Sequence, residues 1–308
     1  MHPVLRRALV RLFEIIPVLW VVVTLTFLMV RWAPGGPFDT ERALTPEAKK
    51  HNDAYYGLDK PLFVQYEKYL SNFLHGDLGT LYRHPDWSVN ELLAQKAPVS
   101  AELGLWATLV ALVIGLGTGV IAASRPRSKR DYGTMAVAMI AICLPSFVLG
   151  PILLLVFGLK LQMVNVMGWN TVGDRVLPSL VLGLYYAAYI ARLTRGSMLE
   201  VRAQDFIRTA RAKGNGSVRI LLVHMLRNAL GPIIAYLAPT VAGLVTGSFV
   251  VESIFQIPGI GRMFVEAALN HEDQLLLGVT VLFSAILLFC NWLGDVLITA
   301  LNPKAAIE

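Results

Sequence analysis

Charged side chains are scarce in this chain of 308 residues: they make up 16% of it, against 55% hydrophobic residues. Soluble domains carry about 25% charged residues, and the apolar residues here come in long blocks. Cysteine is also rare, and Cys143 and Cys290 lie inside apolar blocks without CxxC spacing or a neighbouring histidine. A soluble domain, a disulfide framework and a cysteine metal site are therefore disfavoured, and we expect both cysteines to be small buried hydrophobes.

Motifs for nucleotide binding and catalysis are missing as well. The sequence has no GxxxxGK[ST] loop, and no GxSxG or Ser-x-x-Lys motif near the end of an apolar block. The GLGTG stretch follows no strand, so Gly115 and Gly119 indicate close helix packing instead. The triplet HED at 271–273 lacks the second histidine of a zinc protease and indicates a solvated loop. We expect no catalytic residue, metal site or bound cofactor in this chain.

Six apolar stretches are long enough to cross a bilayer, which takes about 20 residues of helix. They cover approximately residues 12–30, 103–123, 135–159, 176–193, 229–251 and 275–297. The first is longer than the apolar part of a signal peptide and no A-x-A site follows it, so it is interpreted as a retained anchor. Pro145 and Pro151 predict a kink in the third. The predicted fold class is an all-α polytopic membrane protein with six transmembrane helices.

The basic residues predict how these helices are oriented. They gather at the N-terminus and in the second and fourth loops: Arg6, Arg7, Arg11, Arg125, Arg127, Lys129, Arg130, Arg208, Arg211, Lys213, Arg219 and Arg227. Short basic loops stay in the cytoplasm, so both termini are predicted to be cytoplasmic. Because the net charge of +6 sits in these few loops, nucleic-acid binding is disfavoured.

The chain is expected to divide into four parts. These are a cytoplasmic N-terminus and first span (1–30), a periplasmic loop with short helices (31–98), a five-helix core (99–298) and a cytoplasmic tail (299–308). In the periplasmic loop, one helix is predicted from the spacing of Leu62, Tyr66, Tyr69, Leu70 and Phe73. It either packs on the outer face of the membrane domain or forms a docking surface for an external partner.

The fourth loop is predicted to form a helix, a turn and a second helix. Residues 201–213 can be helical, Gly214 and Gly216 end that helix, and Ser217 can cap the next one. Amphipathic helices lying on the bilayer would explain such a basic loop. The short first helix has a narrow apolar face, however, and the small residues Thr209 and Ala210 favour insertion into a cleft of a protein partner.

The same loop resembles a known motif. RTARAKG at 208–214, followed by HMLR, is similar to the E-A-A-x-x-x-G-x9-I-x-L-P loop of bacterial ABC importer permeases. Ala210, Gly214 and Leu226 match that pattern. Four positions depart from it: Arg208 replaces Glu, Thr209 replaces Ala, His224 replaces Ile and Arg227 replaces Pro.

Other stretches extend the resemblance over essentially the whole chain. They are VLRRALVRLFEIIPVLWVVVTLTFLMVRWAPGGPF, YGLDKPLFVQYEKYL, HGDLGTLY, ARLTRGSMLEV, VTGSFVVESIFQIPGIGRMFVEAALN and the terminal LNPK. Together they resemble the OppB-type permease subunits of bacterial oligopeptide ABC importers.

This resemblance implies a type I importer fold in the bacterial inner membrane and a definite set of partners. They are a homologous OppC-type permease, two OppD- and OppF-type ATPases that bind ATP and Mg, an external OppA-type peptide-binding protein, and the peptide. In that family the fourth loop (here about 194–228) inserts a coupling helix into the ATPase. The residues implied for this contact are Phe206, Arg208, Thr209, Ala210, Arg211, Lys213 and Gly214.

A second candidate site is the stretch QIPGIGRMF, where Pro258, Gly259 and Gly261 permit a tight re-entrant turn. It is either part of an outer gate or an ordinary loop before a helix. Two other functions stay open at this point. An ion-coupled transporter should carry carboxylates at mid-membrane, but Asp295 lies near the cytoplasmic end of its span. A membrane enzyme should bring catalytic groups together at the end of a span, and no such set is found.

Overall fold

The computed structural model describes residues 3–301 except 37, 39–44 and 166, so most of the expected tail 299–308 lies outside the described residues. Within these ranges the chain is helical apart from its connections and one isolated bridge between Thr80 and Ser88. The chain therefore has the all-α architecture that its apolar blocks predict.

Five helical segments are long and apolar enough to cross a membrane. They are α1 (Pro3–Trp32, apolar from Arg11), α4 (Val89–Ser124), α7 (Val172–Arg202), the run from Ser217 to Ile254 and α13 (Asp273–Leu301). The run 217–254 comprises α9 (Ser217–Arg219), η2 (Ile220–Leu226), α10 (Arg227–Val245) and α11 (Phe249–Ile254). α4 begins well before the apolar block at 103, because Ser88 and Glu91 form a capping box at Val89.

The third predicted span (135–159) is a pair of helices with a sharp bend between them. α5 (Lys129–Cys143) is followed by α6 (Ser146–Leu153) and the π-helical η1 (Leu154–Lys160), and the chain turns by 101° between them. Leu144 is extended, as the residue before a proline tends to be. The predicted kink at Pro145 is thus confirmed and is large enough to divide the span. Cys143, expected to be buried, is exposed beside this break.

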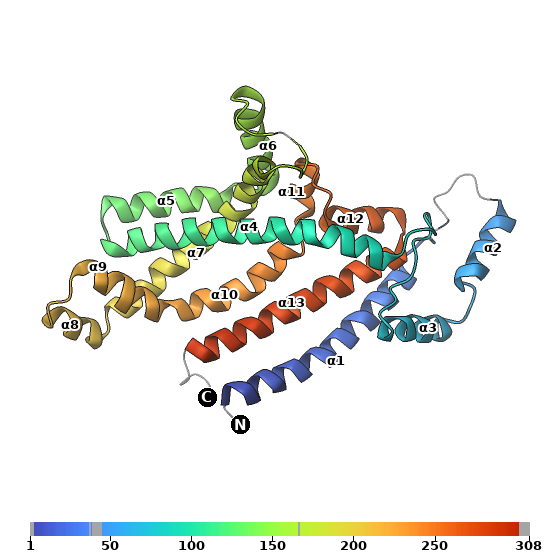
Figure 1. Ribbon diagram of the computed structural model, residues 1–308, viewed down its shortest axis with the longest axis horizontal. Helices are drawn as coiled ribbons and strands as arrows, with labels where there is room; N and C mark the ends of the chain where they lie inside the picture. The colour runs from blue at the N-terminus through green and yellow to red at the C-terminus, as the bar shows by residue number, and fades with distance from the viewer. Residues whose placement is uncertain (1–2, 37, 39–44, 166, 302–308) are drawn as a thin grey trace.

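The helices place the loops at two opposite ends of the molecule (Figure 1). α2 (Pro46–Tyr56), α3 (Leu62–Leu74) and α12 (Ile260–Asn270) lie at the right of the view. α8 (Asp205–Ala212) and α9 lie at the left, which is also the direction in which the first turn of α1 and the last turn of α13 point. Both ends of the described chain therefore share a side with the fourth loop.

Close packing of α4 on α7 depends on glycines. A Cβ atom added at Gly115 would lie 2.7 Å from the carbonyl oxygen of Ala187, and one at Gly119 would lie 2.6 Å from Cβ of Thr194. Gly183 on α7 meets the Ala107 carbonyl of α4 at the same 2.7 Å. The prediction that Gly115 and Gly119 form a helix-packing face is confirmed.

Gly115→Val is therefore expected to destabilise the protein by about 1–3 kcal/mol, because the added side chain must push α7 away. Gly117→Val is a matched control two residues along the same helix, since no atom lies within 4 Å of a Cβ at Gly117. Thermal unfolding of the detergent-solubilised protein tests the pair. Equal unfolding midpoints for the two variants would contradict this account of the α4–α7 contact.

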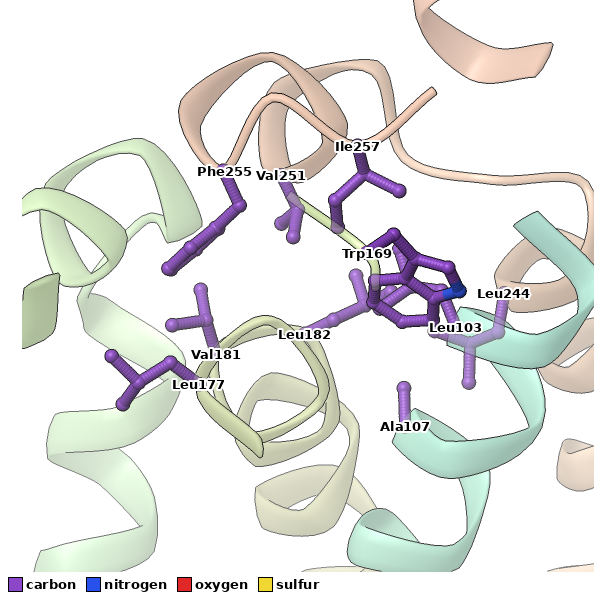
Figure 2. Packing of buried hydrophobic residues seen from close by; sticks show 10 residues of the cluster. All are labelled: Leu103, Ala107, Trp169, Leu177, Val181, Leu182, Leu244, Val251, Phe255 and Ile257. Atoms are coloured by element: carbon purple, nitrogen blue, oxygen red, sulfur yellow. The ribbon is translucent and has the colours of Figure 1, made fainter. Parts of the chain in front are cut away.

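A buried apolar cluster joins α4, α7, α10 and α11 near the bend of the α5–α6 pair (Figure 2). In this cluster Val181 of α7 lies on the side of Phe255, while Leu182 extends toward Trp169 and Leu103. At its edge, the indole nitrogen of Trp169 donates a hydrogen bond of 2.9 Å to Glu102. α11 is thus held against the body of the protein and does not project from it.

The helix α3, predicted to lie in the periplasm, packs on the membrane helices. Phe27 of α1 stacks on Tyr69 with 5.6 Å between ring centroids, and Leu277 of α13 belongs to the same buried cluster. Burial raises the pKa of Tyr69 to about 12. The structure shows that the side of α3 that carries Tyr69 packs on the membrane domain, as the first of the two interpretations predicts. Phe63 and Leu74 on α3 are exposed.

The expectation of a solvated loop at 271–273 is wrong for its two carboxylates, both of which are buried. Glu272 accepts hydrogen bonds of 2.9 Å from the backbone N–H groups of Tyr82 and Arg83. Asp273 forms an ion pair of 3.0 Å with Arg31 at the end of α1. The carboxylates therefore fasten the external segment to the start of α13.

Candidate functional site: the loop between α7 and α10

The fourth loop begins where α7 ends. The predicted helix 201–213 is divided, because Val201 and Arg202 still belong to α7 and the chain turns at Gln204, whose ψ of 150° is extended. The remaining part forms α8. Ser217 is the first residue of α9 and not its cap, which is Gly216, so the predicted capping role of Ser217 is wrong.

The end of α8 is formed by the predicted glycine turn. Gly214 has a φ of +78° and its N–H donates to the carbonyl oxygen of Arg211 at 2.9 Å. Asn215 adds two hydrogen bonds to the carbonyl oxygen of Ala210, one from its backbone and one from its side-chain amide. These bonds satisfy carbonyl groups that a helix end leaves without partners. The turn therefore fixes where α8 stops.

Buried side chains hold α8 against the transmembrane helices. Ile207 is fully buried in a cluster with Ala123 at the end of α4, Met198 of α7 and Met225 of η2. Ala210 is also buried on this side of α8. Because α8 contacts the ends of three membrane-embedded elements at once, a displacement of α8 reaches all three.

A buried ion pair fixes the neighbouring loop as well. Asp131, at the start of α5, is 1% exposed and accepts hydrogen bonds from Nε and Nη2 of Arg195 on α7 at 2.5 and 2.8 Å. The N–H of Arg127 donates to the same carboxylate at 2.9 Å. The second and fourth loops are thus tied to α7 at the same end of the molecule.

The opposite side of α8 is open. Six of the seven residues that the resemblance implies for ATPase contact are exposed there, and we call them the docking face: Phe206, Arg208, Thr209, Arg211, Lys213 and Gly214. Arg208 lies 3.4 Å from Asp205, but both side chains are almost fully exposed, so the ion pair leaves the charge available to a partner. The face presents cations around one aromatic ring.

The seventh residue, Ala210, points into the protein and not toward a partner. Its side chain is buried beside Ile207, so it supports the docking face from behind. An acidic side chain at this position would place a carboxylate in an apolar contact and detach α8. The direct ATPase contact expected of Ala210 stays a prediction; in this structure its side chain is buried.

The second candidate site, at Pro258, Gly259 and Gly261, lies at the other end of the molecule between α11 and α12. Pro258 is exposed, while both glycines are buried against Glu252. The structure does not bring this turn together with the docking face.

Sequence reasoning missed Glu252 as a residue of this turn. Its carboxylate is fully buried, and its two oxygens accept hydrogen bonds from the hydroxyl of Ser100 at 2.8 Å and the N–H of Arg262 at 3.0 Å. Ser100 in turn accepts a hydrogen bond from the N–H of Ile260 at 2.9 Å. One signal was available: Glu252 is an acidic residue directly after an apolar block and ahead of a glycine-rich turn.

Known proteins resemble this chain along its whole length. The oligopeptide transport system permease protein OppB of Salmonella typhimurium is 44% identical over 303 residues, which cover 98% of both chains. OppB of Escherichia coli K12 gives the same figures. The dipeptide transport system permease protein DppB of Bacillus subtilis is 40% identical, again with 98% of both chains covered.

A solved structure supports the fold. A chain of the MetNI methionine ABC transporter in an inward-facing conformation matches with a TM-score of 0.59 and 20% identity, covering 68% of this chain and 96% of that one. The predicted ABC importer permease fold is confirmed. Residues 115–307 also match the family described as "Binding-protein-dependent transport system inner membrane component". This chain therefore belongs to that family of inner membrane transport components and is a transport subunit, not an enzyme.

Proposed function

We propose that this chain is the permease subunit of an ATP-driven peptide importer. In this proposal, α8 contacts the ATPases and is displaced when they bind and hydrolyse ATP. The observation that carries the proposal is the geometry of α8: an exposed cationic face on one side and a buried anchor to three transmembrane elements on the other. The peptide cargo is supported by the relatives, whose names specify oligopeptide and dipeptide transport.

The partners follow from this assignment. Two ATPases bind ATP and Mg outside the membrane domain, a second homologous permease completes the path, and an external binding protein delivers the peptide. The docking face lies in the cytoplasm with both termini, because its arginines and lysine obey the charge rule for short loops. At the opposite end, the turn at Pro258 belongs to the outer closure of the path.

The mechanism is a two-state equilibrium biased by nucleotide. Closure of the ATPases displaces α8, and the cluster around Ile207 passes this displacement to α4, α7 and η2. The bend between α5 and α6 divides that span into two helical segments, while α11 stays fixed to α4, α7 and α10 through the buried cluster. This chain supplies a path and a mechanical link.

Reconstitution of the complete transporter tests the proposal. This chain is expected to purify with two ATP-binding chains and a second permease, and proteoliposomes are expected to import tri-alanine only when ATP and the binding protein are both present. A proton or sodium gradient without ATP is the control. Import driven by the gradient alone would contradict the proposal and favour an ion-coupled transporter.

A further inference from the structure

One side of α7 carries polar groups along the second half of the apolar stretch 176–193 and just beyond it. Tyr185, Tyr189, Arg192 and Gly196 are spaced by four, three and four residues, so they share a face of the helix. Tyr185 and Arg192 are exposed, and no atom lies within 4 Å of a Cβ placed on Gly196. The other sides of α7 pack on α4, α5 and α10, so this face is the free one.

α10 continues this face. Tyr236 lies beside Tyr189, with their rings nearly parallel and 6.1 Å apart. Next to Tyr236, α10 carries a row of exposed residues without long side chains, spaced four residues apart: Gly231, Ala235, Pro239 and Gly243. Figure 1 shows α7 and α10 running across the molecule together. The two helices thus form one continuous surface, which carries polar side chains on α7 and small residues on α10.

The residues of this surface differ from the exposed residues on the helix faces that are expected to contact lipid. The exposed residues of α1 and α4 are large and apolar, for example Leu12, Phe13, Ile16, Leu105, Leu109 and Val113. Tyrosine side chains that face lipid favour the membrane interfaces over the bilayer centre. The pair Tyr185 and Tyr189 instead brackets the midpoint of the 31-residue α7. The chemistry of this face indicates water and polar solutes, not acyl chains.

Arg192 adds a positive charge to this face of α7. It lies at the end of the apolar stretch 176–193, three residues before Arg195, which pairs with Asp131 at the start of α5. Its guanidinium lies 5.2 Å from the ring centroid of Tyr189, and in the described part of the chain no carboxylate lies within ion-pairing distance of it. An exposed guanidinium without a counter-ion at the end of this polar face can bind a carboxylate of a solute.

We propose that Tyr185, Tyr189, Arg192 and Tyr236 form a peptide-contacting surface inside the translocation path. Tyrosine hydroxyls hydrogen-bond to the backbone amides that all peptides share, and Arg192 binds the C-terminal carboxylate through charge complementarity. The row of small residues on α10 leaves room for side chains of different sizes. This inference rests on the proposed function and adds where in the chain the cargo is contacted.

Uptake of tri-alanine by the reconstituted transporter tests the role of the hydroxyls and the guanidinium. Tyr189→Phe and Tyr236→Phe are each expected to lower the maximal rate about threefold to tenfold, and Arg192→Gln by about tenfold or more. The half-saturating peptide concentration should not change, because the external binding protein captures the peptide. Tyr55→Phe is the control, since Tyr55 is an exposed tyrosine on α2, at the other end of the molecule from α8 (Figure 1).

This experiment distinguishes failure of the inference from failure of the proposed function. If the unsubstituted transporter imports tri-alanine and the three variants match it, this inference is overturned while the proposed function stands. If the unsubstituted transporter imports no peptide, the proposed function is contradicted and the inference with it.

Water accessibility gives a readout that does not depend on transport rate. In a chain whose Cys143 and Cys290 are replaced by serine, Tyr189→Cys is expected to react with a water-soluble maleimide in the assembled transporter. Leu109→Cys, at an exposed apolar position of α4, should not react. If residue 189 is as unreactive as residue 109, then lipid or the second permease covers this surface, and the inference is overturned.

Discussion

Gly214→Val is expected to abolish most peptide-stimulated ATP hydrolysis while the transporter still assembles in the membrane. Gly214 adopts a φ of +78°, a conformation that is costly for a β-branched residue. The strain is about 1–2 kcal/mol, and no atom lies within 4 Å of the new Cβ, so strain and not collision decides the outcome. The last turn of α8 relieves this strain by unwinding, which displaces Arg211 and Lys213 from the docking face.

Gly214→Asn is the matched variant, because asparagine adopts the left-handed conformation more readily than other residues with a side chain. Stimulated ATP hydrolysis should fall about fivefold to thirtyfold in the valine variant, in line with the population change that such strain causes. The asparagine variant should stay close to the unsubstituted protein. Equal stimulation in all three would show that the geometry of this turn does not control coupling.

Glu252→Ala is expected to have the largest effect on stability. The carboxylate is fully buried and joins three elements: α11, which carries it, Ser100 of α4 and the first turn of α12 at Arg262. Its removal leaves the Ser100 hydroxyl and the Arg262 N–H without this acceptor in a buried setting, at a cost of about 1–3 kcal/mol for each group. It also removes a negative charge from the start of α12, where the helix dipole favours one.

Thermal unfolding in detergent is the measurement for this change. Glu266→Ala is the control, because Glu266 is an exposed acidic residue that forms an ion pair with the same Arg262. The unfolding midpoint should fall strongly for Glu252→Ala and little for Glu266→Ala. Similar midpoints would contradict the interpretation that Glu252 locks the turn between α11 and α12.

The sequence is informative wherever a feature is local. Apolar blocks locate the membrane helices, Pro145 marks the bend between α5 and α6, and Gly214 marks the end of α8, because each depends on residues close together in the chain. The spacing of Gly115 and Gly119 predicts a packing face for the same reason, although it does not name α7 as the partner helix.

What could not be predicted depends on distant contacts. Glu252 and Ser100 are separated by 152 positions, and Glu272 reaches a backbone N–H group 190 positions away. A carboxylate in a short loop is usually solvated, so the sequence favoured that interpretation for Glu272. The position of α8 could not be predicted for the same reason, because the cluster around Ile207 that holds it is assembled from five elements, α8 included.

The central claim is that the docking face of α8 contacts an ATPase. The most direct measurement is photo-crosslinking from a benzophenone-maleimide attached to Thr209→Cys, an exposed position of α8, in the complete transporter with Cys143 and Cys290 replaced by serine. Trp87→Cys is the control, because Trp87 is exposed two residues before α4, which begins at the opposite end of the molecule from α8 (Figure 1). We predict a product joining this chain to an ATPase from residue 209 and none from residue 87. Absence of that product from residue 209, in a transporter that hydrolyses ATP, would contradict the account.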